Sequence, residues 1–124
     1  MAREIEKESY KVIISEDNAE VVISEEVIAV IAGIAATDIE GVASLTGNMT
    51  RETIQKAGLK NLSKGIGLQM NEDNLTITIS LNIKYGYSVS KISEMVQEKV
   101  KTSVENILGL AVTGVNIRVT GVIL

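Results

Sequence analysis

Between residues 75 and 85 the chain alternates strictly between apolar and polar side chains. The odd positions carry Leu, Ile or Tyr, and the even positions carry Thr, Ser, Asn or Lys. Successive side chains of a strand point to opposite faces, so this pattern predicts a strand with one apolar and one polar face. Residues 65–70 precede this strand across Asn71-Glu72-Asp73-Asn74, and the two segments together predict a hairpin.

Residues 89–108 carry the strongest helical pattern. Ser88 or Ser90 is placed to cap the first turn of this helix, and Gly109 is placed to end it. A final strand is predicted around residues 115–120, where Val and Ile alternate with Asn, Arg and Thr. The predicted apolar face of the helix comprises Val89, Ile92, Met95, Val96, Val100, Val104, Ile107 and Leu108.

A second helix is predicted to begin at Ser24, whose hydroxyl is placed as an N-cap ahead of two glutamates. Residues 27–37 are uncharged and apolar on nearly every side, so we expect this helix to be buried on more than one side. Gly33 lies in mid-helix, where Gly costs ~1 kcal/mol relative to Ala, and is expected to be a close-packing position. Gly41 is expected to end the helix in a left-handed conformation.

Shorter elements complete the predicted fold. Strands are expected at residues 10–14, 21–23 and 42–45, and a helix capped by Thr50 is expected over residues 51–62. Strands with a single apolar face belong to a sheet covered on one side only. The predicted class is therefore α+β, a two-layer sandwich with helices packed on one face of a mixed, mostly antiparallel sheet. Residues 1–9 are expected to form a flexible N-terminal segment and residues 10–124 a single domain.

The composition removes most catalytic chemistry. The chain contains no His and no Cys, which are the commonest general base and the usual thiol nucleophile and zinc ligand. We therefore expect no enzymatic activity, no catalytic residues, no cofactor and no bound metal. The net charge of −4 and the lack of aromatic residues other than three tyrosines argue against nucleic-acid binding. Uncharged runs fall short of the ~20 residues of a membrane-spanning helix, so no direct membrane insertion is expected.

Two local patterns resemble catalytic or phosphate-binding motifs. Ser88-Val89-Ser90-Lys91 matches the S-x-x-K of penicillin-binding enzymes, but the S-D-N and K-T-G elements are absent, so a helix cap is favoured. Gly65-Ile66-Gly67 is rich in glycine, but a strand follows it rather than the helix N-terminus that a phosphate cradle requires.

Two charged patterns resemble ligand-binding sites. The acidic pairs at residues 16–17 and 72–73 lack the ligand spacing of a calcium loop, so solvated turns are favoured. Lys56, Lys60 and Lys64 recur at four-residue spacing, and with Arg51 they could bind anionic lipid or nucleic acid. A solvated helix face is favoured for this Lys strip. A nucleic-acid or anionic-lipid binding module is the alternative function.

Two groups of residues are candidate contacts for a protein partner. Asp38 and Glu40 fall at the C-terminal end of the uncharged helix, where acidic side chains oppose the helix dipole. They would meet either a basic partner or a Lys or Arg of the same chain. The second group is the polar sheet face, made of Thr76, Thr78, Ser80, Asn116 and Arg118. Apart from these two groups, the apolar end at residues 122–124 is a further candidate docking surface.

The chain resembles a known family at its packing and turn residues. Ile31-Ala32-Gly33-Ile34-Ala35-Ala36, Glu40-Gly41-Val42 and Gly109-Leu110-Ala111-Val112, with residues 115–122, are similar to the alkaline shock protein family of Gram-positive envelope stress response proteins. The resemblance implies a non-catalytic interaction or scaffold protein in cell-envelope homeostasis. Such proteins are cytoplasmic, and some are held at the membrane by a partner. We therefore expect a protein partner, and self-association remains open.

Overall fold

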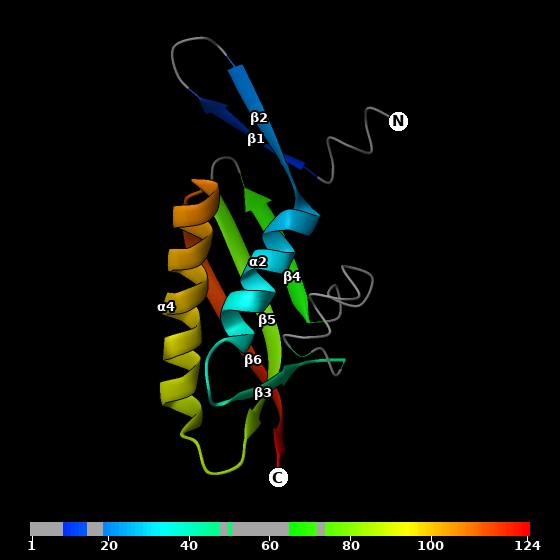
Figure 1. Cartoon of the computed structure of the whole chain (residues 1–124), viewed down its shortest axis with the longest axis vertical. Helices are drawn as coiled ribbons and strands as arrows, with labels where there is room; N and C mark the ends of the chain where they lie inside the picture. Colours follow the sequence, from blue (N-terminus) through cyan, green and yellow to red (C-terminus); the bar gives the residue numbers. More distant parts are fainter. Residues whose placement is uncertain (1–8, 15–18, 48–49, 51–64, 72–73) are drawn as a thin grey trace.

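The computed structural model describes residues 9–14, 19–47, 50, 65–71 and 74–124. Within these residues the chain forms two layers, and a small hairpin projects past one end of them (Figure 1). The elements in chain order are β1 (Ser9–Ile14), β2 (Ala19–Ser24), α2 (Glu25–Thr37), β3 (Val42–Leu45), β4 (Ile66–Asn71), β5 (Asn74–Lys84), α4 (Val89–Leu108) and β6 (Val112–Ile123). The predicted α+β class is confirmed.

β5 is the centre of the larger sheet, because β3, β4 and β6 all pair with it. β6 runs parallel to β5 along one edge, as expected when a long helix connects the two strands. β4 and β3 both pair antiparallel with the other edge of β5, one beyond the other. The boundary between β3 and β4 lies at Ser80 of β5. The Ser80 carbonyl accepts a hydrogen bond from Thr46, just after β3, and the Ser80 N–H donates one to Gly65, just before β4. The sheet is thus mixed and mostly antiparallel, as predicted.

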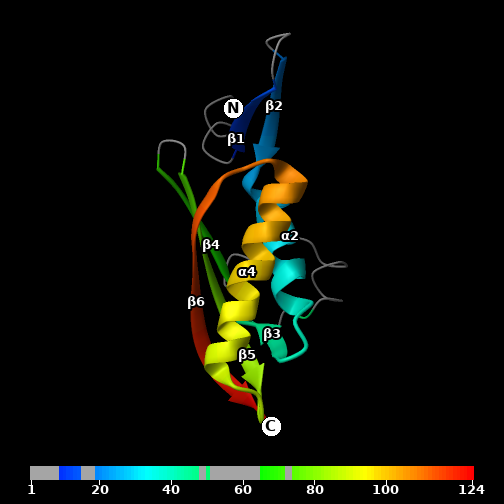
Figure 2. The same ribbon diagram turned by 90° about the vertical axis from the view of Figure 1, so that its left-hand side faces the viewer.

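The two helices of the described residues, α2 and α4, lie on the same face of this sheet (Figure 2). The side chains that alternate toward the helices on β5 form the centre of the core, and each of them is 0% exposed: Leu75, Ile77, Ile79, Leu81 and Ile83. α4 contributes Val96, Val100 and Val104, and α2 contributes Ile28 and Ala32. Because every second residue of β5 enters this core, the residues between them lie on the face that α2 and α4 do not cover.

The helix ends follow most of the predicted capping pattern. The Ser24 hydroxyl accepts a hydrogen bond from the Val27 backbone N–H at 3.3 Å, and the Ser88 hydroxyl accepts one from Lys91 at 3.4 Å. Gly109 ends α4 in the left-handed conformation, with φ of 71°. These contacts satisfy backbone groups that the first and last helical turns leave without a partner.

The prediction for Gly41 is wrong. Its φ is not positive, and α2 ends earlier, at Thr37, with Asp38 in a right-handed conformation as the C-cap. Gly41 instead allows close packing, because a Cβ placed there would lie 2.5 Å from Ile92 Cδ1 and 2.8 Å from Tyr87 Cδ2. The physical requirement at this position is space for α4 rather than an unusual backbone angle.

The buried surfaces of the helices are narrower than their apolar patterns suggest. On α4, Val89, Met95 and Ile107 were predicted on the core face but are 44%, 52% and 64% exposed. α2 contacts both the sheet and α4, and Gly33 is buried as expected, yet Val27 remains 43% exposed. Each helix therefore keeps apolar side chains on the surface. The predicted helix over residues 51–62, with its Lys strip, and both acidic pairs lie outside the described residues.

Candidate interaction site

The five residues predicted on the polar sheet face lie together. Thr76, Thr78 and Ser80 follow one another on β5, while Asn116 and Arg118 are exposed on β6. The parallel register places Thr78 beside Asn116 and Ser80 beside Arg118. Residues two apart on a strand are about 7 Å apart, so this group forms a continuous polar surface on the face opposite α2 and α4 (Figure 2). We call it the polar sheet face.

Hydrogen bonds between side chains of three strands or their ends continue this surface. Thr120 Oγ1 lies 2.9 Å from Thr46 Oγ1 and 3.0 Å from Asn82 Oδ1. The Asn82 amide donates to the Ser44 hydroxyl at 3.2 Å. The one hydroxyl proton of Thr120 has two acceptors, Asn82 Oδ1 and the Leu81 carbonyl at 3.2 Å, so Thr46 is the donor in its bond to Thr120. Cross-strand bonds of this kind fix the side chains, so the surface presents an ordered set of polar groups.

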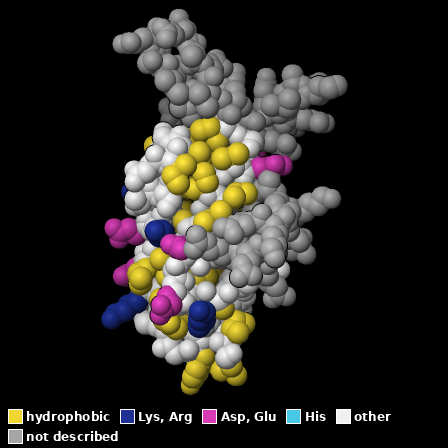
Figure 3. All heavy atoms as spheres, viewed as in Figure 1, with side chains coloured by type: hydrophobic (Ala, Val, Ile, Leu, Met, Phe, Trp, Pro, Cys, Tyr) yellow, Lys and Arg dark blue, Asp and Glu magenta, His cyan; other side chains and the backbone are white. Residues whose placement is uncertain are grey.

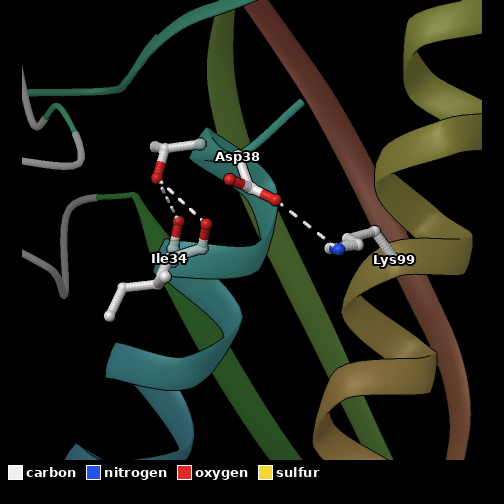
Figure 4. A network of polar contacts seen from close by, with 5 residues as sticks. Ile34, Asp38 and Lys99 are labelled. Atoms are coloured by element: carbon white, nitrogen blue, oxygen red, sulfur yellow. Dashed lines mark hydrogen bonds and ion pairs between the residues drawn. The ribbon is translucent and has the colours of Figure 1, made fainter. Parts of the chain in front are cut away.

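Asp38 and Glu40 belong to the helix layer and not to the polar sheet face. Asp38 Oδ2 lies 3.5 Å from Lys99 Nζ of α4, and both side chains are partly exposed (Figure 4). The charge of Lys99 offsets the acidic end of α2, which is the same-chain alternative weighed for these residues. An exposed pair of this kind contributes little to stability, on the order of 0–1 kcal/mol. The structure thus divides the predicted contact residues between two separate surfaces.

Glu40 has a different partner, the phenol of Tyr87. Tyr87 donates a hydrogen bond to Glu40 Oε2 at 2.9 Å, across the junction between the end of α2 and the start of α4. This hydrogen bond, with desolvation and the negative charge of Glu40 as smaller causes, raises the pKa of Tyr87 above 10.0. No local sequence pattern indicates this pair, because 47 positions separate the two residues.

The patterns that resembled catalytic motifs have structural roles. Ser88, the serine of the S-x-x-K match, caps α4, and of Gly65-Ile66-Gly67 the last two residues begin strand β4. In the part of the chain that the structure describes, no group of three or more Asp, Glu, His or Cys side chains is arranged to hold a metal ion. Among the same residues, no helix combines the length and apolar character needed to cross a membrane.

An apolar surface lies at the end of β6. Val122 and Ile123 are 51% and 49% exposed, and Leu124 is 98% exposed. The backbone of Ile123 accepts a hydrogen bond from Tyr85, whose side chain is also exposed. The end of β6 is therefore held to the end of β5, and its apolar side chains stay accessible to a partner.

Comparison with known proteins places this fold in a family. Residues 13–124 match the model of the alkaline shock protein 23 family, whose described function is related to the cell envelope. The chain belongs to this family. The match spans α2, α4 and the whole larger sheet, whose strands β5 and β6 carry the polar sheet face. No solved structure matches the chain.

The similar proteins come from Gram-positive bacteria. The chain is 34% identical to the protein YqhY of Bacillus subtilis over 100 residues, which cover 81% of this chain and 74% of YqhY. It is 38% identical to the protein Spy1535 of Streptococcus pyogenes over 105 residues, which cover 84% and 79% of the two chains. It is 36% identical to the protein YloU of B. subtilis over 102 residues, covering 81% and 85%. All three relatives carry the description "uncharacterized", so their names assign no activity to the family.

Proposed function

We propose that this protein is a non-catalytic interaction module of cell-envelope homeostasis, which binds a protein partner through the polar sheet face and is held near the membrane by it. The observation that carries the proposal is the alignment of Thr76, Thr78 and Ser80 with Asn116 and Arg118 on one face that neither described helix covers. The cell-envelope-related function described for the family supports a role for this protein at the cell envelope.

The side chains of the polar sheet face are suited to binding another protein. Hydroxyl and amide groups in regular rows donate and accept hydrogen bonds, and the guanidinium of Arg118 can bind a carboxylate through two parallel hydrogen bonds. The net charge of the chain is −4, and an anionic membrane surface attracts basic segments, by ~1 kcal/mol for each Lys or Arg. A protein partner is therefore the better explanation for a role at the envelope than direct contact with lipid.

The proposal is tested by recovery of partners from membranes of the native host with the tagged full-length chain. The double variant Asn116→Glu with Arg118→Glu changes two exposed positions on the polar sheet face. The control variant Lys101→Glu with Thr102→Glu makes the same change of charge on the exposed surface of α4. We expect the first variant to lose a partner that the wild type and the control retain, while all three melt at similar temperatures. Equal recovery by all three proteins would refute a role for this face.

Direct lipid binding through Lys56, Lys60 and Lys64 is the competing explanation, and it is tested by flotation of the pure protein with anionic vesicles. We expect the protein to stay in the soluble fraction. Strong flotation that added salt abolishes would contradict the proposal, because it would show direct electrostatic binding to lipid headgroups. Salt weakens such binding, since charges are screened beyond about 10 Å at 0.1 M salt.

A further inference from the structure

The outward side of α2 is apolar, which is unusual for a helix that covers a sheet. A helix at the surface of a protein ordinarily carries charged residues on the side away from the core. In α2 no charged residue occurs between Val27 and Thr37. Val27 is 43% exposed, and Val30, Ile31 and Ile34 are only partly buried although they pack at the margin of the core. Hydrophobic side chains gather on the surface where α2 and the last turns of α4 lie, with acidic side chains at the margins (Figure 3).

α2 and α4 lie side by side in opposite directions (Figures 1 and 2). A groove lined by residues of both helices runs between them. Its hollow has a volume of about 280 Å³ and is lined by Ile31, Ile34, Ala35, Asp38, Lys99, Ser103 and Ile107. Ala35 and Ser103 contribute small side chains to this lining, and Ile31, Ile34 and Ile107 contribute large apolar ones. Ile107 on α4 is 64% exposed.

A second hollow continues the groove along α2. It has a volume of about 220 Å³, is lined by Glu26, Val27, Val30 and Ile31, and shares Ile31 with the first. From Glu26 to the C-cap Asp38 the surface follows thirteen residues, or about 18 Å for the twelve rises of 1.5 Å between them. That length matches about three turns of a second helix lying along it.

The charges at the two ends of the groove are unequal. Glu25 and Glu26 lie at the beginning of α2, and the described residues that line this end of the groove include no Lys or Arg. Asp38 lies at the other end, where Lys99 offsets its charge. The surface is therefore apolar along its length, acidic at one end and close to neutral at the other.

We propose that the α2–α4 groove binds an amphipathic helix of a partner protein, with its apolar side in the groove and Lys or Arg residues over Glu25 and Glu26. This inference rests on the proposed interaction function and adds a second surface to it. Helices pack by placing the side-chain ridges of one helix into the grooves of another, and a groove between two helices accepts a third in this way. Basic residues at the flank of such a helix complement the acidic end of α2.

A second copy of the chain fits this groove poorly. A symmetric contact between two α2 helices that run in opposite directions would bring Glu26 of one copy near Asp38 of the other. Parallel helices would bring the two Glu26 side chains together. The parallel arrangement opposes like charges, and the antiparallel arrangement places Glu26 over the Asp38–Lys99 pair, which has no net positive charge to complement it. A membrane fits poorly as well, because the acidic end would face anionic headgroups.

The test is an NMR titration of the isotope-labelled full-length chain with a synthetic Leu/Lys amphipathic peptide of about 14 residues, which is ~21 Å long as a helix. A Leu/Glu peptide of the same pattern is the control ligand. We expect the Leu/Lys peptide to shift the backbone signals of Ile31, Ser103 and Ile107, and to leave those of Thr78 and Asn116 unchanged. The Leu/Glu peptide should bind at least tenfold more weakly, because Glu25 and Glu26 would repel it.

Two variants identify the groove in the same titration. Ile107→Asp should weaken Leu/Lys binding by about tenfold or more, as for a buried anchor of an interface, whereas Val122→Asp on β6 should leave it unchanged. Both replaced side chains are more than half exposed, so both variants are expected to fold, and Ile107→Ala provides a milder change at the same position. Glu26→Lys should weaken binding of the Leu/Lys peptide and strengthen that of the Leu/Glu peptide.

Several results would overturn this inference. They are absence of Leu/Lys binding, equal binding of the two peptides, signal shifts confined to the polar sheet face, or unchanged affinity in Ile107→Asp. The inference would also be overturned if anionic vesicles shifted the same groove signals that the Leu/Lys peptide is expected to shift, because the occupant would then be lipid. None of these results changes the outcome expected for Asn116→Glu with Arg118→Glu, so failure of the groove is distinguishable from failure of the proposed function.

Discussion

At the scale of single residues, Gly41 allows the segment that follows α2 to pack closely against the start of α4. It follows α2 and lies against Ile92 in the first turns of α4, and its carbonyl accepts a hydrogen bond from the Lys84 backbone. Ile92 is 6% exposed and has little room to move. The sequence showed that a glycine was present here, but only the structure shows that the missing side chain matters rather than the backbone angle.

Gly41→Ala is expected to lower the free energy of unfolding by about 1–3 kcal/mol, because the added methyl group overpacks Ile92 and Tyr87. Chemical denaturation measures the change. Gly67→Ala is the matched control, since a Cβ at Gly67 would lie 3.9 Å from Thr78, at ordinary contact distance. The control should stay within about 0.5 kcal/mol of the wild type. Equal effects of the two substitutions would contradict the close packing at Gly41.

The bond between Tyr87 and Glu40 predicts a dependence on high pH. The pKa of Tyr87 is raised in the folded protein, so the bond contributes fully to stability below the ordinary tyrosine pKa of about 10. That contribution is lost as the pH rises through the raised value, when the tyrosinate faces a carboxylate. Glu40→Gln should lower the pKa of Tyr87 toward 10.0. NMR of labelled Tyr rings during a pH titration measures this, with Glu98→Gln as control, and an unchanged pKa in Glu40→Gln would refute the assignment.

At the scale of elements, local periodicity predicted α4 and β5 well. The predicted helix boundaries agree with Val89–Leu108, and the apolar positions within β5 are the ones that the structure buries. Tyr85, predicted on the same apolar face, follows the end of β5 and is 72% exposed. In both elements the pattern recurs over many turns or residues, so local chemistry suffices to define them. The parallel pairing of β5 with β6, and the placement of β3 and β4 along one edge, depend on contacts between distant parts of the chain. No short pattern encodes those contacts.

Ser88→Ala is expected to destabilise the protein by about 1 kcal/mol, because it removes the acceptor for the Lys91 backbone N–H. Thermal or chemical unfolding measures the loss. Ser90→Ala, two residues further into α4, should stay within about 0.5 kcal/mol of the wild type. A larger loss of stability for Ser90→Ala than for Ser88→Ala would show that Ser88 is not the residue that caps α4.

Gly33→Leu tests the packing of α2. Gly33 is buried in the middle of that helix, and a Leu side chain there should overpack its surroundings and destabilise the protein by about 1–3 kcal/mol. Val27→Leu is a suitable control, because Val27 is 43% exposed and lies on the same helix. An unfolding curve that Gly33→Leu leaves unchanged would show that this position has room for a side chain.

At the scale of the whole molecule, the two-layer arrangement separates two kinds of surface. The helices leave the polar sheet face accessible, and they present an apolar groove with an acidic end on the other side (Figures 2 and 3). Sequence alternation predicted the first surface, since Thr and Asn at every second position must share a face. It did not predict the groove, because Ile31 and Ile107 come together only when α2 and α4 pack.

The most direct test of the central proposal is site-specific photo-cross-linking of the full-length chain in its native host. A photoreactive residue is placed at Thr78 or Asn116 on the polar sheet face, or at Lys101 or Thr102 on the exposed surface of α4. We expect the first two positions to cross-link a discrete, identifiable protein of the cell envelope, and the two α4 positions not to do so. Cross-linking of that protein from the α4 positions alone, or of lipid rather than protein from the polar sheet face, would contradict the proposed function.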